Sequence, residues 1–170
     1  EVIGGILMPG DGAADPSGVT HMLAKGARKH GAQIFEKSPV DEILTKDGKI
    51  SGVKVNGHKI DCEYIVLASG MWSRQIGEKA EVSIPLYPAE HFYIITEPID
   101  NLSKTLPVIR DFDNRTYIKE DAGKILVGIF EGNSIPAWDK TNKVPEDFSF
   151  GEFQENFEHF EPYLASAIKR

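Results

Sequence analysis

Cysteine is almost absent from this 170-residue chain. Cys62 stands alone, so no disulfide can form within the chain, and a cysteine-rich zinc cluster is excluded as well. A lone cysteine in a segment that favours a strand is typical of proteins from reducing compartments. We therefore expect no metal site.

Long apolar runs and basic clusters are also missing. No stretch reaches the roughly 20 apolar residues that a membrane-spanning helix needs, and the first residues lack the features of a signal peptide. The 19 Lys and Arg are outnumbered by 26 Asp and Glu and are scattered along the chain. We therefore expect a soluble protein that binds neither a membrane nor nucleic acid.

Apolar residues are nevertheless abundant enough for a core. They make up 41% of the chain, with 9% aromatic residues, and the length suits one ordinary domain. A disordered chain is therefore a poor interpretation.

The first strong signal is a helix that begins at Asp15-Pro16 and ends before Gly31. Asp15 can cap the free N–H groups, Pro16 has a backbone angle suited to the first helical position, and Gly31 is a typical C-terminal stop. One face of this helix is formed by small and apolar residues, namely Val19, Met22, Leu23, Gly26 and Ala27.

Two consecutive hairpins follow the helix. Asp47-Gly48 and Asn56-Gly57 favour the positive φ angles of tight hairpin turns. The flanking segments 40–45, 50–55 and 58–62 are therefore predicted to form a small antiparallel meander.

The segment Tyr64–Ala68 differs in kind. Its five residues are continuously apolar, which predicts a strand covered on both faces. It ends in Ser69-Gly70, ahead of a helical segment at 72–76.

From Ile84 onward the pattern predicts a second, antiparallel sheet with strands at 90–96, 115–119 and 124–130. Segment 134–149 reads as a long surface loop. The last segment, 150–170, is predicted to be a helix with one aromatic and aliphatic face, formed by Phe153, Phe157, Phe160 and Leu164. These elements together predict a mixed α/β (α+β) fold.

Several motifs resemble a known family. They read GDGAADP at 10–16, GAR at 26–28, GA at 31–32 and LASGMWS at 67–73. In this order they resemble the D-amino-acid-oxidase-like family of FAD-dependent oxidoreductases.

The second half resembles one branch of that family. PLYPAEHFYIITEP at 85–98, and VIRDFD at 108–113 leading to Tyr117, are similar to dimethylglycine dehydrogenase, sarcosine dehydrogenase and dimethylglycine oxidase. The likeness runs from about Gly4 to Ile168.

The resemblance implies a domain plan. Residues 1–83 would form a second segment of a Rossmann-like FAD-binding domain, including the meander, and residues 84–170 a truncated substrate domain. The Gly-x-Gly-x-x-Gly turn that holds the FAD pyrophosphate in this family has no match in the chain. The resemblance thus implies an internal fragment, inactive by itself, of a longer protein that binds FAD and whose C-terminal region would bind tetrahydrofolate.

The implied activity is the oxidative demethylation of small N-methyl amino acids such as dimethylglycine or sarcosine. Hydride passes to FAD, and the one-carbon unit passes to folate. A regulatory protein similar to the regulatory subunit of pyruvate dehydrogenase phosphatase is an alternative, as is a generic amino-acid oxidase. The resemblance points to the bacterial cytoplasm or the mitochondrial matrix without choosing between them.

His91 and Tyr117 are the candidate catalytic residues. By resemblance they match the histidine and tyrosine that face the flavin, with His91 tuning amine protonation and Tyr117 orienting the substrate. From the residues alone, a surface histidine and a tyrosine packed on its sheet remain open. For Arg110 we predict a salt bridge with nearby Asp111 or Asp113 rather than with a substrate carboxylate.

Candidate cofactor residues lie in the first half. By resemblance, Val40 offers backbone groups to the adenine, and Ser69, Gly70 and Trp72 form the turn that passes the flavin, where a side chain at Gly70 would obstruct approach. The alternative is a strand-to-helix turn that needs glycine for its backbone alone. Uncovered apolar surface on a fragment would also favour self-association.

Overall fold

The computed structural model describes residues 2–141 and 143–170, which form two compact units. The first comprises the described residues through Gln33, with 91–132 and 155–170. The second comprises 34–90 and 133–154 with the exception of Asn142. The domain boundary predicted between residues 83 and 84 stays a prediction.

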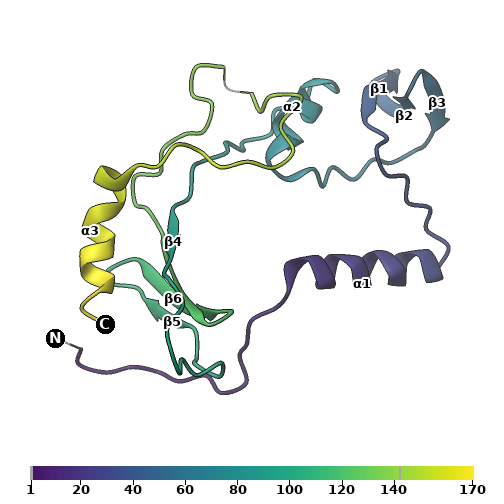
Figure 1. Cartoon of the computed structure of the whole chain (residues 1–170). Helices are drawn as coiled ribbons and strands as arrows, with labels where there is room; N and C mark the ends of the chain where they lie inside the picture. The colour runs from purple at the N-terminus through teal and green to yellow at the C-terminus, as the bar shows by residue number, and fades with distance from the viewer. Residues whose placement is uncertain (1, 142) are drawn as a thin grey trace. The chain divides into compact units, whose positions relative to one another are not determined.

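Helix α1 (Pro16–Lys29) forms where the sequence predicts it (Figure 1). The Asp15 carboxylate accepts a hydrogen bond from the Ser17 N–H at 3.1 Å, and Gly31 follows the helix with a φ of +92°. None of the helix residues is buried, and Met22 and Leu23 are 65% and 70% exposed. The apolar face predicted from the sequence thus exists but is uncovered.

The meander is also confirmed. Strands β1 (Val40–Lys46), β2 (Lys49–Val55) and β3 (His58–Asp61) pair antiparallel in sequence order. Both residues of each turn have positive φ, at Asp47-Gly48 and at Asn56-Gly57. This is the geometry for which Asp-Gly and Asn-Gly are favoured.

The predicted buried strand at Tyr64–Ala68 is wrong. The segment is extended but belongs to no strand, and Tyr64 and Val66 are 86% and 90% exposed. A strand needs a neighbour to receive its backbone N–H and C=O groups, and no other part of the described chain lies beside this segment as a paired strand. The helical prediction after it holds, because a 3₁₀ turn at Gly70–Trp72 leads into α2 (Ser73–Glu78).

The second sheet is antiparallel, as predicted, and its strand order is β4-β7-β6-β5. Its strands are β4 (Tyr93–Ile95), β5 (Ile109–Asp111), β6 (Thr116–Asp121) and β7 (Lys124–Ile129). Strand β4 is shorter than predicted, and β5 is a strand that the sequence pattern did not indicate, since three residues are too few for a period.

Helix α3 (Phe157–Ala167) packs on one face of this sheet, against β6 and β7 (Figure 1). Registered residues Val127 and Ile118 lie on that face, and the side chains of Ile129 and Phe160 are 0% and 3% exposed. Ring contact between Phe92 and His159, with centroids 5.1 Å apart, joins the same face to the helix. The opposite face of the sheet is not covered by α3.

The predicted start of the last helix at residue 150 is wrong. The helix starts after Asn156, whose side chain caps it by accepting a hydrogen bond from the His159 N–H at 3.0 Å. Phe153 lies outside the helix and packs instead on Trp138, with ring centroids 5.2 Å apart. Local capping and this aromatic contact outweigh the helical spacing of the phenylalanines.

Segment 134–149 contains no helix or strand among its described residues, as predicted, and Asn142 lies outside the described residues. Its backbone is tied to the segment before His91: the Glu90 N–H donates to the Ile135 carbonyl at 2.8 Å, and the Ala137 N–H donates to the Pro88 carbonyl at 3.0 Å. The loop is thus anchored near its start.

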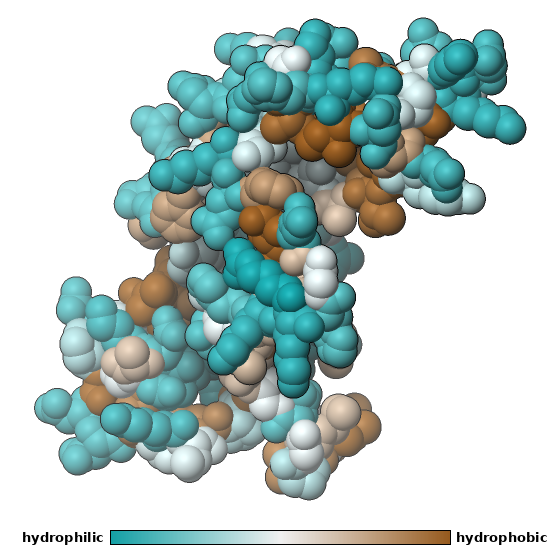
Figure 2. All heavy atoms as spheres, turned by 90° about the vertical axis from the view of Figure 1, so that its right-hand side faces the viewer, coloured by the Kyte–Doolittle hydropathy of each residue, from teal (hydrophilic) through white to brown (hydrophobic). Residues whose placement is uncertain are grey.

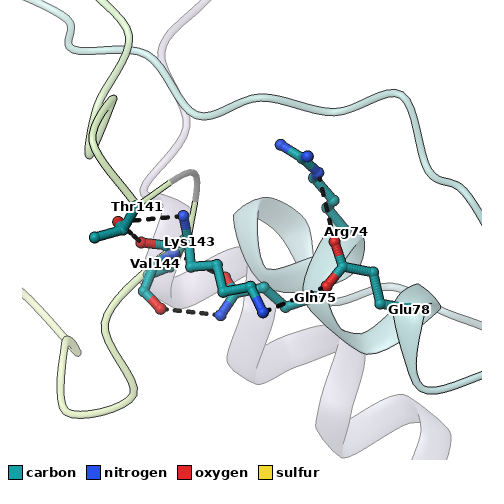
Figure 3. Close-up of polar contacts among 6 residues, drawn as sticks. All are labelled: Arg74, Gln75, Glu78, Thr141, Lys143 and Val144. Atoms are coloured by element: carbon teal, nitrogen blue, oxygen red, sulfur yellow. Dashed lines mark hydrogen bonds and ion pairs between the residues drawn. The ribbon is translucent and has the colours of Figure 1, made fainter.

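A second anchor is the Gln75 side chain of α2 (Figure 3). Its amide group donates to the Val144 carbonyl at 3.0 Å and accepts from the Val144 N–H at 2.8 Å. Val144 is 2% exposed, so these backbone groups have little access to water. The Gln75 amide therefore pairs with both backbone groups of Val144, as a neighbouring strand would in a sheet.

We expect Gln75→Ala to lower the free energy of unfolding by about 1–3 kcal/mol, because it leaves both buried backbone groups of Val144 unpaired. The control is Arg74→Ala on the same helix, which removes a 3.8 Å ion pair with Glu78 worth about 0.5 kcal/mol or less. Urea unfolding of the two variants measures the difference. Equal small losses would contradict the anchoring role of Gln75.

Apolar side chains reach the surface in several places, among hydrophilic ones (Figure 2). Besides Met22 and Leu23 they include Ile3, Ile6 and Phe150, which are 101%, 95% and 93% exposed. Self-association of the isolated chain stays a prediction that these surfaces support. Within the described chain no helix is both long enough and apolar enough to cross a membrane.

Candidate active site on the open face of the second sheet

A row of registered residues crosses the sheet on the face opposite α3. Tyr93 on β4 pairs with Gly128 on β7, Gly128 pairs with Tyr117 on β6, and Tyr117 pairs with Arg110 on β5. Directly paired residues of antiparallel strands point to the same side of the sheet. The strand register thus places two phenols and a guanidinium on one surface.

Gly128 makes room for the Tyr117 ring. A Cβ atom added at Gly128 would meet the ring carbons and the hydroxyl of Tyr117. The phenol therefore lies flat across the strand, over the one residue without a side chain. A glycine inside a strand typically marks such a close approach.

His91 precedes β4 and lies beside this phenol. Its Nε2 is 3.3 Å from the Tyr117 hydroxyl, and the two rings are stacked with centroids 6.1 Å apart and an angle of 7° between their planes. The His91 side chain is 46% exposed. The structure therefore brings the two predicted catalytic residues together on an accessible surface, while their roles stay a prediction.

Tyr117 keeps its hydroxyl proton more firmly than a free tyrosine. Burial raises its pKa, and the charge of Glu131 and the neighbouring Tyr93 raise it further, while Arg110 acts in the opposite direction. The phenol is protonated at neutral pH and can donate a hydrogen bond to the His91 Nε2 in the tautomer that leaves this nitrogen without a proton.

The predicted salt bridge of Arg110 is wrong. Within the described chain neither Asp111 nor Asp113 pairs with it, and its guanidinium lies 4.3 Å from the centre of the Phe130 ring. Asp111 is engaged elsewhere: hydrogen bonds from the side chain and backbone of Asn114, then one from Arg170, lower its pKa to about 2. The cation–π contact holds the guanidinium at the open face without neutralising its charge.

Phe130 is the residue that joins this group. Its ring is 5.2 Å from the Tyr117 ring and 6.0 Å from the His91 ring, between centroids, in addition to its contact with Arg110. The apolar Phe130 ring thus contacts the side chains of all three polar residues.

The predicted cofactor turn belongs to the second unit. Gly70 has a φ of +54° and open space where a Cβ would stand. With Leu67, Ala68, Met71, Ser73 and Leu86–Pro88 it lines an open groove of about 450 Å³ whose exposed lining is mostly apolar. Trp72 follows within the same 3₁₀ turn and is half-buried, as is Ser69.

These residues fit the flat face and the apolar dimethylbenzene end of an isoalloxazine ring system. The groove has the volume of a small-molecule site, and a backbone without a side chain at Gly70 permits close approach. Val40 fits less fully, because its carbonyl at the start of β1 already accepts a hydrogen bond from the Lys79 ammonium at 2.9 Å. Its role toward an adenine stays a prediction.

Three residues of the site were not predicted from the sequence: Gly128, Phe130 and Glu131. A glycine within the apolar run of β7 was a usable signal, because it indicates close approach of another group. Glu131 carried no sequence signal, since its position under His91 depends on the pairing of β4 with β7.

Comparison with known proteins agrees with the motifs. The model of the FAD dependent oxidoreductase family matches residues 1–170. 4-Methylaminobutanoate oxidase (formaldehyde-forming) of Paenarthrobacter nicotinovorans is 38% identical over 98% of this chain and 20% of its own length. The mitochondrial pyruvate dehydrogenase phosphatase regulatory subunit of Mus musculus is 35% identical over 100% of this chain and 19% of its own length. Human mitochondrial sarcosine dehydrogenase is 31% identical over 100% of this chain and 18% of its own length.

A solved structure shares the fold. The crystal structure of L-proline dehydrogenase from P. horikoshii matches with a TM-score of 0.71 and 27% sequence identity, covering 92% of this chain and 39% of that one. The mixed α/β fold class is therefore confirmed.

The chain belongs to the family of FAD-dependent oxidoreductases. Within it, the dimethylglycine and sarcosine dehydrogenases predicted from the second-half motifs are among its relatives. The chain spans about a fifth of the length of these curated relatives.

Proposed function

We propose that the full-length protein containing this chain oxidises N-methyl amino acids with FAD. The observation that carries the proposal is the contact of His91 with Tyr117, 3.3 Å from ring nitrogen to hydroxyl, on an accessible face that also presents Arg110. Such a face offers a proton acceptor, a hydroxyl and a cation to one small zwitterionic molecule.

The chemistry explains why this set is useful. Bound FAD would supply the acceptor for a hydride from the N-methyl carbon, and the oxidised amine would be an iminium. Only the neutral amine has the nitrogen lone pair that stabilises this product, so the ammonium form must first lose a proton. An ammonium that meets the Tyr117 oxygen can give its proton there while the Tyr117 hydroxyl proton moves to the His91 Nε2.

Arg110 suits the other end of such a substrate. A guanidinium can hold a carboxylate through two parallel hydrogen bonds. The cation–π contact with Phe130 fixes the side chain beside Tyr117, so little rotational freedom remains to be lost on binding. We therefore propose a substrate with a carboxylate near the amine.

For the cofactor, the groove at Gly70 would receive the flavin, with Ser69 and Trp72 in the same turn. Val40 would contribute backbone groups to the adenine. Pyrophosphate binding we assign to other parts of the full-length protein.

The fate of the one-carbon unit is a separate part of the proposal. Hydrolysis of the iminium releases the one-carbon unit as formaldehyde. Tetrahydrofolate bound elsewhere in the full-length protein would instead capture the one-carbon unit. The printed name of the Paenarthrobacter relative specifies formaldehyde formation. Formaldehyde measured with and without tetrahydrofolate separates the two outcomes.

Anaerobic addition of sarcosine, dimethylglycine or 4-methylaminobutanoate tests the proposal directly. We expect at least one of these amines to bleach the flavin absorbance of the full-length protein within seconds, and glycine, which lacks the methyl group, to leave it oxidised. The measurement is stopped-flow absorbance near 450 nm.

A regulatory function is the second candidate. It is favoured by the 35% identity to the regulatory subunit of pyruvate dehydrogenase phosphatase over the whole chain. Flavin that stays oxidised with all three amines would favour it. Flavin reduced equally well by ordinary amino acids would instead favour a generic amino-acid oxidase.

A further inference from the structure

Glu131 lies directly beneath the candidate site. Its side chain is 3% exposed, whereas that of His91 is 46% exposed. One carboxylate oxygen accepts a hydrogen bond from the Phe92 N–H at 3.0 Å, and the other lies 3.3 Å from the Nδ1 of His91. A buried carboxylate thus contacts the ring nitrogen that points away from Tyr117.

The chemistry of the carboxylate decides which His91 nitrogen holds a proton. An ionised carboxylate only accepts hydrogen bonds, so its contact with Nδ1 requires a proton on Nδ1. In the neutral imidazole the other nitrogen, Nε2, then has a lone pair. The Tyr117 hydroxyl, 3.3 Å away, is protonated at neutral pH and donates to that lone pair.

The four groups therefore form one directed chain of hydrogen bonds. The Phe92 N–H and the His91 Nδ1–H both donate to Glu131, and the Tyr117 hydroxyl donates to the His91 Nε2. The backbone anchor matters, because it leaves the second oxygen of Glu131 aimed at the ring.

We propose that Glu131 is a positioning residue that holds neutral His91 in its Nδ1–H tautomer, so that Nε2 faces Tyr117 as a proton acceptor. The consequence for catalysis rests on the proposed function, whereas the tautomer does not. A carboxylate that orients a histidine through its far nitrogen is an arrangement that recurs in proton-transfer sites.

Glu131→Gln tests this directly, because it keeps the shape and changes the donor. The Phe92 N–H continues to bind the amide oxygen, which turns the amide NH₂ toward Nδ1. Nδ1 must then accept, and the proton moves to Nε2. We expect the wild-type protein to show protonated Nδ1 and the variant to show protonated Nε2.

The measurement is long-range ¹H–¹⁵N NMR of histidine-labelled full-length protein at a pH where the ring is neutral, with the His91 signals assigned by a His91→Gln variant. The matched control is Glu120→Gln, whose carboxylate binds the Gly123 N–H at the β6–β7 turn. It should leave the His91 tautomer unchanged. Circular dichroism verifies that each variant folds.

The outcomes separate this inference from the proposed function. A wild-type ring protonated at Nε2, or a folded Glu131→Gln variant with an unchanged tautomer, overturns the role of Glu131 whatever the activity. A tautomer switch supports that role. With the switch, we also expect flavin reduction to slow by about tenfold or more at little change in KM. A switch without slower reduction would overturn the proposed proton route but keep the tautomer assignment.

If Glu131→Gln does not fold, the wild-type spectrum alone decides the tautomer, and Tyr117→Phe provides the second variant. It keeps the stacked ring and removes the hydroxyl that donates to Nε2, so the Nε2 resonance should shift while Nδ1 stays protonated. An Nε2 resonance that does not respond would overturn the proposed chain.

Discussion

His91→Ala in the full-length protein should lower the rate of flavin reduction by an N-methyl amino acid about 10²–10⁴-fold, the usual contribution of one positioned acid–base group. The variant removes the Nε2 that is 3.3 Å from the Tyr117 hydroxyl. A proton leaving the substrate ammonium would then have no base beyond the phenol. The expected loss grows as the pH falls, because more substrate is protonated.

Stability should change little by comparison. The His91 side chain is 46% exposed, so its removal should cost about 1 kcal/mol or less. His58→Ala at the exposed start of β3 is the matched control. Stopped-flow flavin reduction and thermal unfolding are measured on the same samples. Parallel losses of rate and stability in His91→Ala would indicate a structural histidine instead.

Local chemistry made the first half of the fold predictable. The helix at Asp15-Pro16 and the hairpin turn at Asn56-Gly57 follow from backbone preferences within a few residues, so no distant contact was needed. Tyr64–Ala68 failed for the opposite reason. A strand is a relation between two segments, and an apolar run does not supply its own neighbour.

The site was predictable as residues but not as an arrangement. His91 and Tyr117 were found through the flanking motifs, yet their contact depends on the register of β4 and β6 with β7, which fixes Tyr117 above Gly128. No sequence pattern states that register. Glu131 was not predicted for the same reason, although its side chain is 3% exposed and its carboxylate lies 3.3 Å from the His91 Nδ1.

Arg110 shows how sequence proximity misleads. Its neighbour Asp111 was a predicted partner, but adjacent residues of a strand point to opposite faces of the sheet. Asp111 accordingly binds Asn114 and Arg170, and Arg110 lies on the face of Tyr117. Because Arg110 pairs with neither aspartate, its guanidinium keeps its charge on the face of Tyr117, where we propose that a substrate binds.

Arg110→Met should therefore raise the KM for sarcosine about 10–100-fold, the equivalent of losing one charge-assisted hydrogen-bonded pair. The kcat should fall much less, because the guanidinium holds the carboxylate in the ground state and the transition state alike. Arg110→Lys should recover part of the loss at most, since an ammonium keeps the charge without the planar fork.

N-Methylisobutylamine provides the decisive comparison, because it has the size and shape of sarcosine but carries a neutral isopropyl group in place of the carboxylate. If Arg110 binds the carboxylate, Arg110→Met leaves the kinetics of this amine nearly unchanged. The kcat/KM for sarcosine, divided by that for this amine, then falls. Arg74→Met on α2 controls for loss of a surface guanidinium. Equal effects on both amines would assign Arg110 to packing on Phe130, because a lost ring contact disturbs Tyr117 whatever the substrate.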